Sequence, residues 1–244
     1  MPAAELRTLI ETRVEERLGG RFPAPLGWRR KTASQTAPTG IAEVDALTSG
    51  LPRGGLTEVY GPVSSGRTAL VFSLLAEFTR RQELCALMDA DDSFDPASAA
   101  AAGVELGRLL WVRSSAGTAA LRCVEQALRA ADLVLQAGGF GLVVLDLGDV
   151  PAATARRVPL ASWFRFRRAV EDTPASLLLL TQEAVTGACA ALTLKLEATA
   201  PAEETTLPAH ARLLGGFSVT VEVARSASAR RSESERKTAF ATGL

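Results

Sequence analysis

Short, unbroken runs of apolar residues constrain the fold of this chain more than any other feature of its sequence. Residues 142–145 and 176–181 are the clearest of these runs, and each follows a segment with helical periodicity. A strand that is apolar on both sides must be covered on both sides, as strands are in a parallel sheet between two layers of helices. The sequence therefore predicts an α/β fold with a mostly parallel sheet flanked by helices.

Other apolar and amphipathic segments extend the same alternation. After residue 182 the pattern changes, and two segments alternate apolar with polar residues, as half-exposed antiparallel strands do. We expect C-terminal antiparallel strands there. The predicted strands are 56–60, 84–88, 109–112, 142–145, 176–181, 191–197 and 217–224, and the predicted helices are 68–81, 95–102, 118–136 and 160–172.

Composition excludes several classes of protein. The 27 acidic and 27 basic side chains of this 244-residue chain cancel, which argues against a surface that is basic all over. No apolar stretch approaches the roughly 18 residues of a membrane span, and the first residues lack the apolar core of a signal peptide, so we expect a cytoplasmic protein without membrane contact. Cys85, Cys123 and Cys189 are expected to be buried, reduced thiols. A single histidine, His210, is too little for a histidine metal centre, and we expect it in a loop or on the surface.

The two ends of the chain differ from its middle. Residues 3–18 have apolar side chains at a four-residue spacing and predict an amphipathic helix, which either covers the core or docks on a partner. Residues 19–40 are rich in Gly, Pro, Ser and Thr, as linkers are. We therefore expect an N-terminal helix and linker in residues 1–38, a core in residues 39–225, and a flexible tail in residues 226–244.

The segment from Gly61 to Thr68, GPVSSGRT, lies between a predicted strand and a predicted helix. It matches the phosphate-binding pattern G-x-x-x-x-G-K-[ST] except at the lysine, which is replaced by Arg67. Glycines let backbone N–H groups approach an anion at a helix N-terminus. A structural Gly-Ser turn is the alternative. The candidate nucleotide-binding residues are Gly61, Ser64, Ser65, Gly66, Arg67 and Thr68, with Thr68 also a candidate Mg²⁺ ligand.

With Arg67 in place of the lysine, the sequence leaves open whether this loop binds nucleotide. Lysine is a compact point charge, whereas a guanidinium is larger, planar and suited to bidentate partners. The substitution keeps the charge but changes the geometry with which a phosphate would be held. Productive ATP binding and its loss are therefore both compatible with the sequence.

Polar residues follow three other predicted parallel strands, at the edge where open α/β sheets bind ligands. Asp146 ends the run 141–146 and is a candidate Mg²⁺ ligand, or else a turn former. The segment 89–92 has three carboxylates, one of which could orient a water molecule, although such residues are also common in solvated loops. Gln182 ends the run 177–181 and could sense a terminal phosphate and transmit its presence to the following loop.

Taken together, these segments closely resemble the RecA family. The resemblance rests on GIAEVDALTSGLPRGGLTEVYGPVSSGRTAL, LCALMDADDSFDPASAAAAGVELGRLLWV and GLVVLDLGDV, and more weakly on LLLLTQ to FSVTVEVARS. It implies a RecA-like P-loop core with ATP and Mg²⁺ as cofactors. The length and the altered loop are most similar to the ImuA group of RecA-like accessory proteins of damage-induced mutagenesis. That similarity implies ImuB, a Y-family-like polymerase, and a replicative-type polymerase as partners, with RecA as a further possible partner.

Departures from the RecA pattern fall along one reaction path. The resemblance assigns water activation to Asp91, one methylene shorter than the family's glutamate, and phosphate sensing to Gln182. A displacement of about 1 Å can cost on the order of a hundredfold in rate. The loop after Gln182 is short and mainly apolar. We therefore expect an accessory protein of translesion synthesis with weak or no ATPase activity; the alternatives are an active ATP-dependent recombinase or DNA-dependent ATPase, and a regulator that binds nucleotide without hydrolysing it.

The segment 163–168, Trp-Phe-Arg-Phe-Arg-Arg, has two interpretations. Interleaved aromatic and arginine side chains are typical of single-stranded DNA binding. In a helix, however, Trp163, Phe166 and Val170 share one side, so an amphipathic helix packed on the sheet is favoured.

Overall fold

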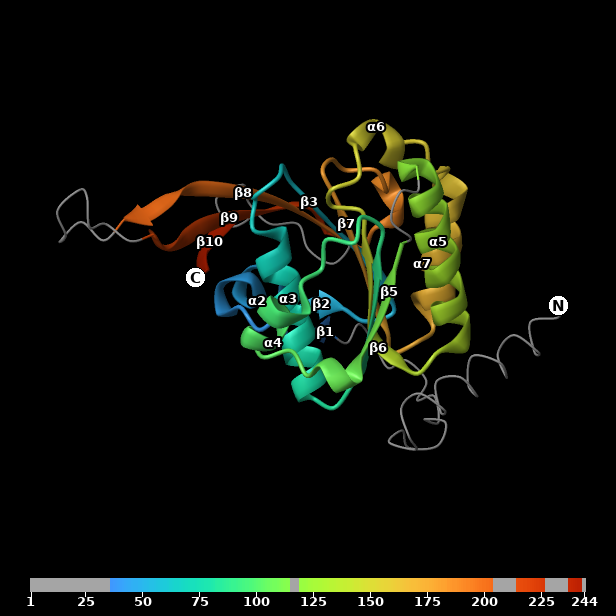
Figure 1. The fold of residues 1–244 in the computed structure, drawn as a ribbon, viewed down its shortest axis with the longest axis horizontal. Coiled ribbons are helices and arrows are strands. Elements are labelled where there is room, and N and C mark those ends of the chain that lie inside the picture. Colours follow the sequence, from blue (N-terminus) through green and yellow to red (C-terminus); the bar gives the residue numbers. More distant parts are fainter. Residues whose placement is uncertain (1–35, 115–118, 204–213, 227–236, 243–244) are drawn as a thin grey trace.

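The computed structural model describes residues 36–114, 119–203, 214–226 and 237–242. Its centre is a twisted sheet between two layers of helices, as Figure 1 shows. In the described part of the chain the sheet has eight strands in the order β10-β9-β8-β3-β7-β6-β4-β5. They are β3 (Gly55–Tyr60), β4 (Leu84–Asp89), β5 (Leu109–Arg113), β6 (Phe140–Asp146), β7 (Ser176–Thr181), β8 (Leu192–Glu203), β9 (Leu214–Ser226) and β10 (Lys237–Thr242).

The strands from β8 to β5 are parallel, and β9 and β10 continue the sheet in antiparallel pairs. One face of the sheet is covered by α2 (Ala42–Thr48), α3 (Arg67–Arg80) and α4 (Pro96–Ala101), and the other by α5 (Ala120–Ala137), α6 (Ala152–Ala155) and α7 (Leu160–Glu171). Two short strands, β1 (Thr36–Ala37) and β2 (Leu51–Pro52), pair beside the sheet. Single 3-10 turns lie at Leu106–Arg108 and Gly187–Cys189.

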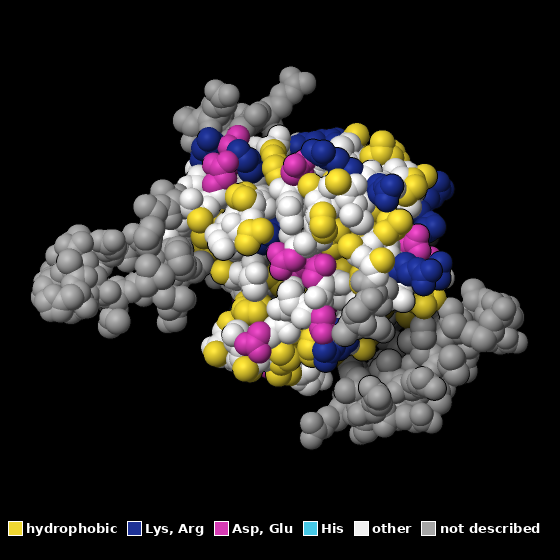
Figure 2. Space-filling model, turned by 45° about the horizontal axis from the view of Figure 1, so that its top comes forward, with side chains coloured by type: hydrophobic (Ala, Val, Ile, Leu, Met, Phe, Trp, Pro, Cys, Tyr) yellow, Lys and Arg dark blue, Asp and Glu magenta, His cyan; other side chains and the backbone are white. Residues whose placement is uncertain are grey.

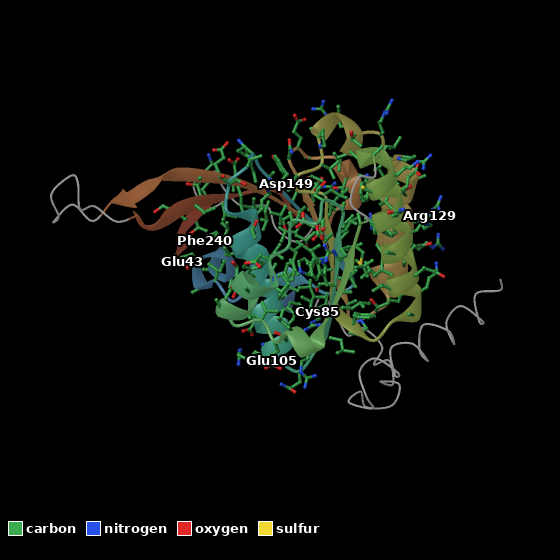
Figure 3. All side chains as sticks on the ribbon, viewed as in Figure 1. Glu43, Cys85, Glu105, Arg129, Asp149 and Phe240 are labelled. Carbon is green, nitrogen blue, oxygen red and sulfur yellow. The ribbon has the colours of Figure 1, made fainter. Side chains whose placement is uncertain are left out.

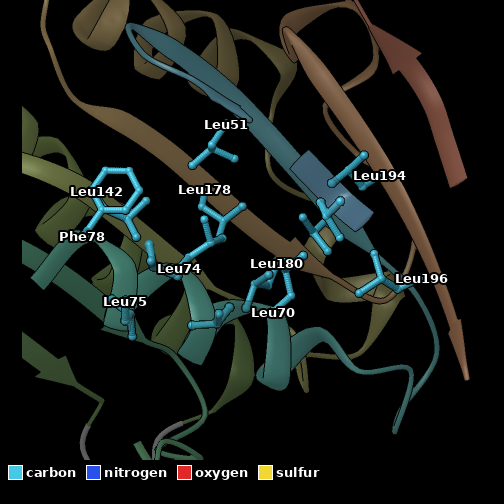
Figure 4. Close-up of a cluster of buried hydrophobic side chains, with 14 of the residues drawn as sticks. Leu51, Leu70, Leu74, Leu75, Phe78, Leu142, Leu178, Leu180, Leu194 and Leu196 are labelled. Atoms are coloured by element: carbon cyan, nitrogen blue, oxygen red, sulfur yellow. The ribbon is translucent and has the colours of Figure 1, made fainter. Parts of the chain in front are cut away.

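The two hydrophobic cores explain the solid apolar runs. Alternate side chains of a strand point to opposite faces. In β7, Leu178 and Leu180 pack under α3, while Leu177 and Leu179 pack under α5 and α7. Figure 4 shows the α3 side, where Leu70, Leu74, Leu75 and Phe78 of the helix meet leucines from several strands. The predicted α/β class and the mostly parallel sheet are confirmed.

The C-terminal part differs from expectation in two respects. β8 pairs with β9 in the antiparallel sense but also with β3 in the parallel sense, so it joins the two parts of the sheet. Within the tail expected to be flexible, residues 237–242 form the edge strand β10, and Phe240 is buried against the core beside α2. The tail expected to be flexible thus contains a strand that pairs with β9 and packs Phe240 into the core.

The predicted N-terminal helix, the linker up to residue 35 and His210 lie outside the described residues. All three cysteines are buried and free, as predicted. No helix in the described ranges has the length and apolar character needed to cross a membrane.

Candidate functional site

The GPVSSGRT loop joins β3 to α3, as the sequence predicts, and its backbone is tightly confined. Gly66 has φ 89° and caps the N-terminus of α3, and Ser64 also has a positive φ, 62°. A Cβ on Gly61 would lie 2.3 Å from the carbonyl oxygen of Leu196, and one on Gly66 would lie 2.4 Å from Cγ2 of Val219. Both glycines are therefore required, because the β8–β9 hairpin packs directly against the loop.

The polar residues of this loop differ in their exposure to solvent. Ser64 and Thr68 are exposed, whereas Ser65 is buried and its hydroxyl has no hydrogen-bond partner. An orphaned buried hydroxyl and a glycine-formed turn at the start of a 14-residue helix are features that an anion cradle also has. The loop therefore keeps the outline of a phosphate-binding turn.

Arg67 turns away from this loop and into the protein. Its Nη1 atom donates hydrogen bonds to the carbonyl oxygens of Gly148, at 2.7 Å, and Thr181, at 2.9 Å. These acceptors lie just beyond β6 and at the end of β7, so the guanidinium ties the carboxyl ends of two neighbouring strands to α3. Arg67 is only 7% exposed. Its hydrogen bonds are therefore made with the sheet, and its charge is withdrawn from the surface of the loop.

Carboxylates surround the Arg67 guanidinium without chelating it. Nη2 lies 3.8 Å from Oδ1 of Asp149, which is half-exposed. Burial lowers the pKa of Arg67, and the charges of Asp146 and Asp149 oppose that shift. Even so, an arginine stays protonated in proteins. The arrangement is thus a fixed positive charge at the end of β6, where the sequence predicted a divalent cation.

Asp146 ends β6, and its Oδ1 accepts a hydrogen bond from the backbone N–H of Gly148 at 2.8 Å. Desolvation raises the pKa of Asp146 to about 7; the hydrogen bond from Gly148 and the charge of Arg67 oppose the shift, and the charge of Asp89 adds to it. A carboxyl group with this pKa is about half protonated at pH 7. In the described part of the chain, no interaction joins Thr68 to Asp146.

The three carboxylates after β4 have separate structural surroundings. Asp89 is buried and accepts hydrogen bonds from the N–H groups of Ser93 and Phe94 and from Nε1 of Trp111, so it shapes the turn after the strand. Asp92 forms an ion pair with Arg113 at 2.6 Å.

Asp91 is the exposed member of the three. Desolvation of its carboxyl group, with the charge of Asp149 and to a smaller extent that of Asp89, raises its pKa to about 6 despite the exposure of the residue as a whole. The backbone of Asp149 and of Val150 lowers the pKa of Asp91 and so opposes part of this shift. Asp91 therefore faces the segment that follows β6, and Figure 3 places Asp149 of that segment at the upper end of the sheet.

Gln182 follows β7 and is partly exposed. The loop after it is held by Glu58, a residue of β3 that is 1% exposed. The carboxylate of Glu58 accepts hydrogen bonds from the N–H of Val185, at 2.6 Å, and from the N–H and hydroxyl of Thr186, at 3.2 and 2.6 Å. A buried carboxylate with three donors is satisfied, and it fixes the loop to the central strand.

The residues at this edge of the sheet do not fit Mg²⁺ and a triphosphate. The charge at the lysine position is bound to two backbone carbonyls, and no cluster of Asp, Glu, His or Cys in the described ranges is placed to hold a metal ion. The positive charge at this site is that of the Arg67 guanidinium, which two hydrogen bonds fix in place.

The structure thus brings some of the predicted residues together and separates others. Arg67, Asp146 and the end of β7 converge, while Thr68 lies on the surface. Sequence reasoning missed Glu58 and Gly148. Glu58 is a charged residue inside an apolar strand, which was the available signal. Gly148 was not recognisable from the sequence, because its role depends on a contact 81 residues away.

The fold and the loop define an α/β domain built on a strand–loop–helix unit at the carboxyl edge of a parallel sheet. The family model "RecA N-terminal domain" matches residues 6–157, and the chain belongs to this family. It is similar to proteins named Protein RecA: 34% identical over 136 residues to that of Lactobacillus acidophilus, 36% over 149 residues to that of Prochlorococcus marinus (strain MIT 9303), and 35% over 137 residues to that of Ectopseudomonas oleovorans. These matches cover 55%, 61% and 55% of this chain but only 36%, 37% and 37% of the relatives.

Proposed function

We propose that this chain is a RecA-like accessory protein of damage-induced translesion DNA synthesis, similar in role to ImuA, that works in the cytoplasm by binding polymerase partners. In this proposal ATP hydrolysis is weak or lost. The partners are ImuB, a Y-family-like polymerase, and a replicative-type polymerase.

One observation carries the proposal. Arg67 stands at the position of the phosphate-binding lysine, yet both of its short hydrogen bonds go to backbone carbonyls of the sheet. Releasing it to meet a phosphate would leave two carbonyl oxygens without their donor, at a cost of about 1–3 kcal/mol for each buried group. A side chain that stabilises the fold in this way opposes the binding that catalysis needs.

The loop after Gln182 supports the same conclusion. A sensor must move between an ordered and a disordered state, and the three hydrogen bonds to Glu58 hold this loop in one arrangement. Gln182 in this chain is then a fixed residue at the end of β7.

Nucleotide turnover tests the catalytic half of the proposal. The purified chain is incubated with ATP, Mg²⁺ and single-stranded DNA, and we expect turnover well below about 0.1 per second, slow for an enzyme. Isothermal titration with a nonhydrolysable ATP analogue should show no binding at millimolar ligand. DNA-stimulated turnover above that rate would indicate an active recombinase or DNA-dependent ATPase, and binding without turnover would indicate a nucleotide-binding regulator.

Partner capture tests the other half. The tagged chain is recovered from bacteria after DNA damage, and the bound proteins are identified by mass spectrometry against undamaged cells. We expect polymerases to be enriched after damage. Recovery of the chain without any polymerase would contradict the accessory role, whatever the ATPase result.

A further inference from the structure

The outer side of α7 has a composition unlike that of an ordinary solvated helix. Its inner side packs on the sheet through Trp163, Phe166 and Val170, as predicted. On the outer side, Leu160 is 56% exposed and Phe164 is 50% exposed. Because residues four apart lie on the same helix face, these two form one apolar strip.

Arginines continue this strip at both ends. Arg167 and Arg168 lie one turn beyond Phe164, and Arg157 lies three residues before Leu160, the first residue of the helix. All three are exposed and form no ion pair within the described ranges. We call the surface formed by Arg157, Leu160, Phe164, Arg167 and Arg168 the α7 face.

The segment that contains the α7 face has a net positive charge, to which the arginines of the face itself contribute. Residues 151–172 contain five arginines and two acidic residues, in a chain whose net charge is zero. Of the two remaining arginines, Arg165 pairs with Asp132 and Arg156 with Glu183. On the right-hand side of Figure 2, where α5, α6 and α7 lie, dark blue side chains alternate with yellow ones.

We propose that the α7 face binds an acidic polypeptide segment of a partner protein, with apolar side chains three or four residues apart. Phe and Arg are enriched in the centres of protein interfaces. The exposed Leu160 and Phe164 would contact the apolar side chains, and the arginines would pair with carboxylates. The charge of the face selects for an acidic segment. This inference does not rest on the proposed function, since it requires neither nucleotide nor a polymerase.

A polypeptide fits this face better than single-stranded DNA does. DNA-binding grooves stack successive bases on successive aromatic rings. On α7, Trp163 and Phe166 are buried and only Phe164 offers a ring to solvent. Leu160, the other large exposed apolar residue of this helix, has no ring on which a base could stack.

Peptide selection tests the proposal directly. Random peptides of about 16 residues, roughly 24 Å long as helices, are displayed on phage and selected against the full chain. We expect the enriched sequences to be acidic, with apolar residues three or four apart. Fluorescein-labelled copies of these peptides are then titrated with the chain by fluorescence anisotropy, beside a labelled oligothymidylate.

Two double variants make the measurement specific. Phe164→Ser with Arg168→Glu alters the α7 face, and Leu106→Ser with Arg108→Glu makes the same changes in the distant 3-10 turn near Glu105, labelled in Figure 3. Leu106 is 40% exposed, so both variants replace one exposed apolar side chain and one arginine. Circular dichroism verifies that both are folded.

The α7 variant should weaken peptide binding by at least about tenfold, while the control variant binds as the unmodified chain does. Enriched peptides without an acidic bias, or equal binding by all three proteins, would overturn the proposal. So would the absence of enriched peptides together with oligothymidylate binding that the α7 variant abolishes, which would make this face a nucleic-acid surface.

Discussion

Replacing Arg67 with alanine should strongly destabilise the fold. The substitution removes the donor for the carbonyls of Gly148 and Thr181 and the cation beside Asp146. Hydrogen bonds to a charged group contribute about 1.5–3 kcal/mol each, so we expect a loss of about 3–5 kcal/mol. Arg67→Lys should lose about 1–3 kcal/mol, because one ammonium group at the end of a flexible stem replaces a planar fork with five donors.

Urea denaturation followed by circular dichroism measures these differences as shifts of the midpoint at constant slope. Thr68→Ala is the control, since this exposed neighbour should change the free energy of unfolding by less than about 0.5 kcal/mol. The expected order of stability is wild type and Thr68→Ala, then Arg67→Lys, then Arg67→Ala. The reasoning is refuted if Arg67→Ala unfolds within about 1 kcal/mol of the wild type, because the guanidinium would then not hold the strands together.

Three further changes test other parts of the structure. The pKa of Asp146 is raised to about 7 from its ordinary value near 4, so its ionisation removes stability as the pH rises between these values. Asp146→Asn should therefore be more stable than the wild type by about 1–3 kcal/mol at pH 8, and this difference in the free energy of unfolding should close toward pH 4. A difference that does not vary with pH would contradict the raised pKa of Asp146. Glu58→Gln should raise the amide hydrogen exchange of Val185 at least about tenfold, because a neutral acceptor holds the N–H more weakly; unchanged exchange would mean that the loop is held by something else. Gly66→Ala should cost about 2 kcal/mol or more in urea denaturation, and adding Val219→Ala should recover part of that loss, because the new Cβ would contact Val219; strict additivity of the two changes would argue against this contact.

The sheet was predictable because its strands are buried on both sides. In β7, consecutive leucines serve opposite cores, so the sequence shows an unbroken apolar run that no half-exposed strand would have. The carboxyl ends of these strands were equally predictable as the polar edge. β10 was not, because it lies at the edge of the sheet, where its pairing with β9 and the burial of Phe240 depend on the folded chain.

The state of the candidate site could be predicted only in part. The substitution at Arg67 raised the expectation of an impaired site, but nothing in the sequence indicates which way the side chain turns. That direction depends on carbonyl oxygens 81 and 114 residues further along the chain. The hydrogen bond from the Thr186 hydroxyl to the Glu58 carboxylate joins residues 128 positions apart, and it could not be predicted from the sequence for the same reason. Local patterns predict elements and their ends, whereas hydrogen bonds between distant segments need the folded chain.

The commitment of the Arg67 side chain to the sheet is best tested by a crystal structure grown with millimolar nonhydrolysable ATP analogue and Mg²⁺. We predict that Nη1 still donates to the carbonyl oxygens of Gly148 and Thr181, with no ordered triphosphate in the loop. A guanidinium turned outward onto bound phosphates would contradict the account.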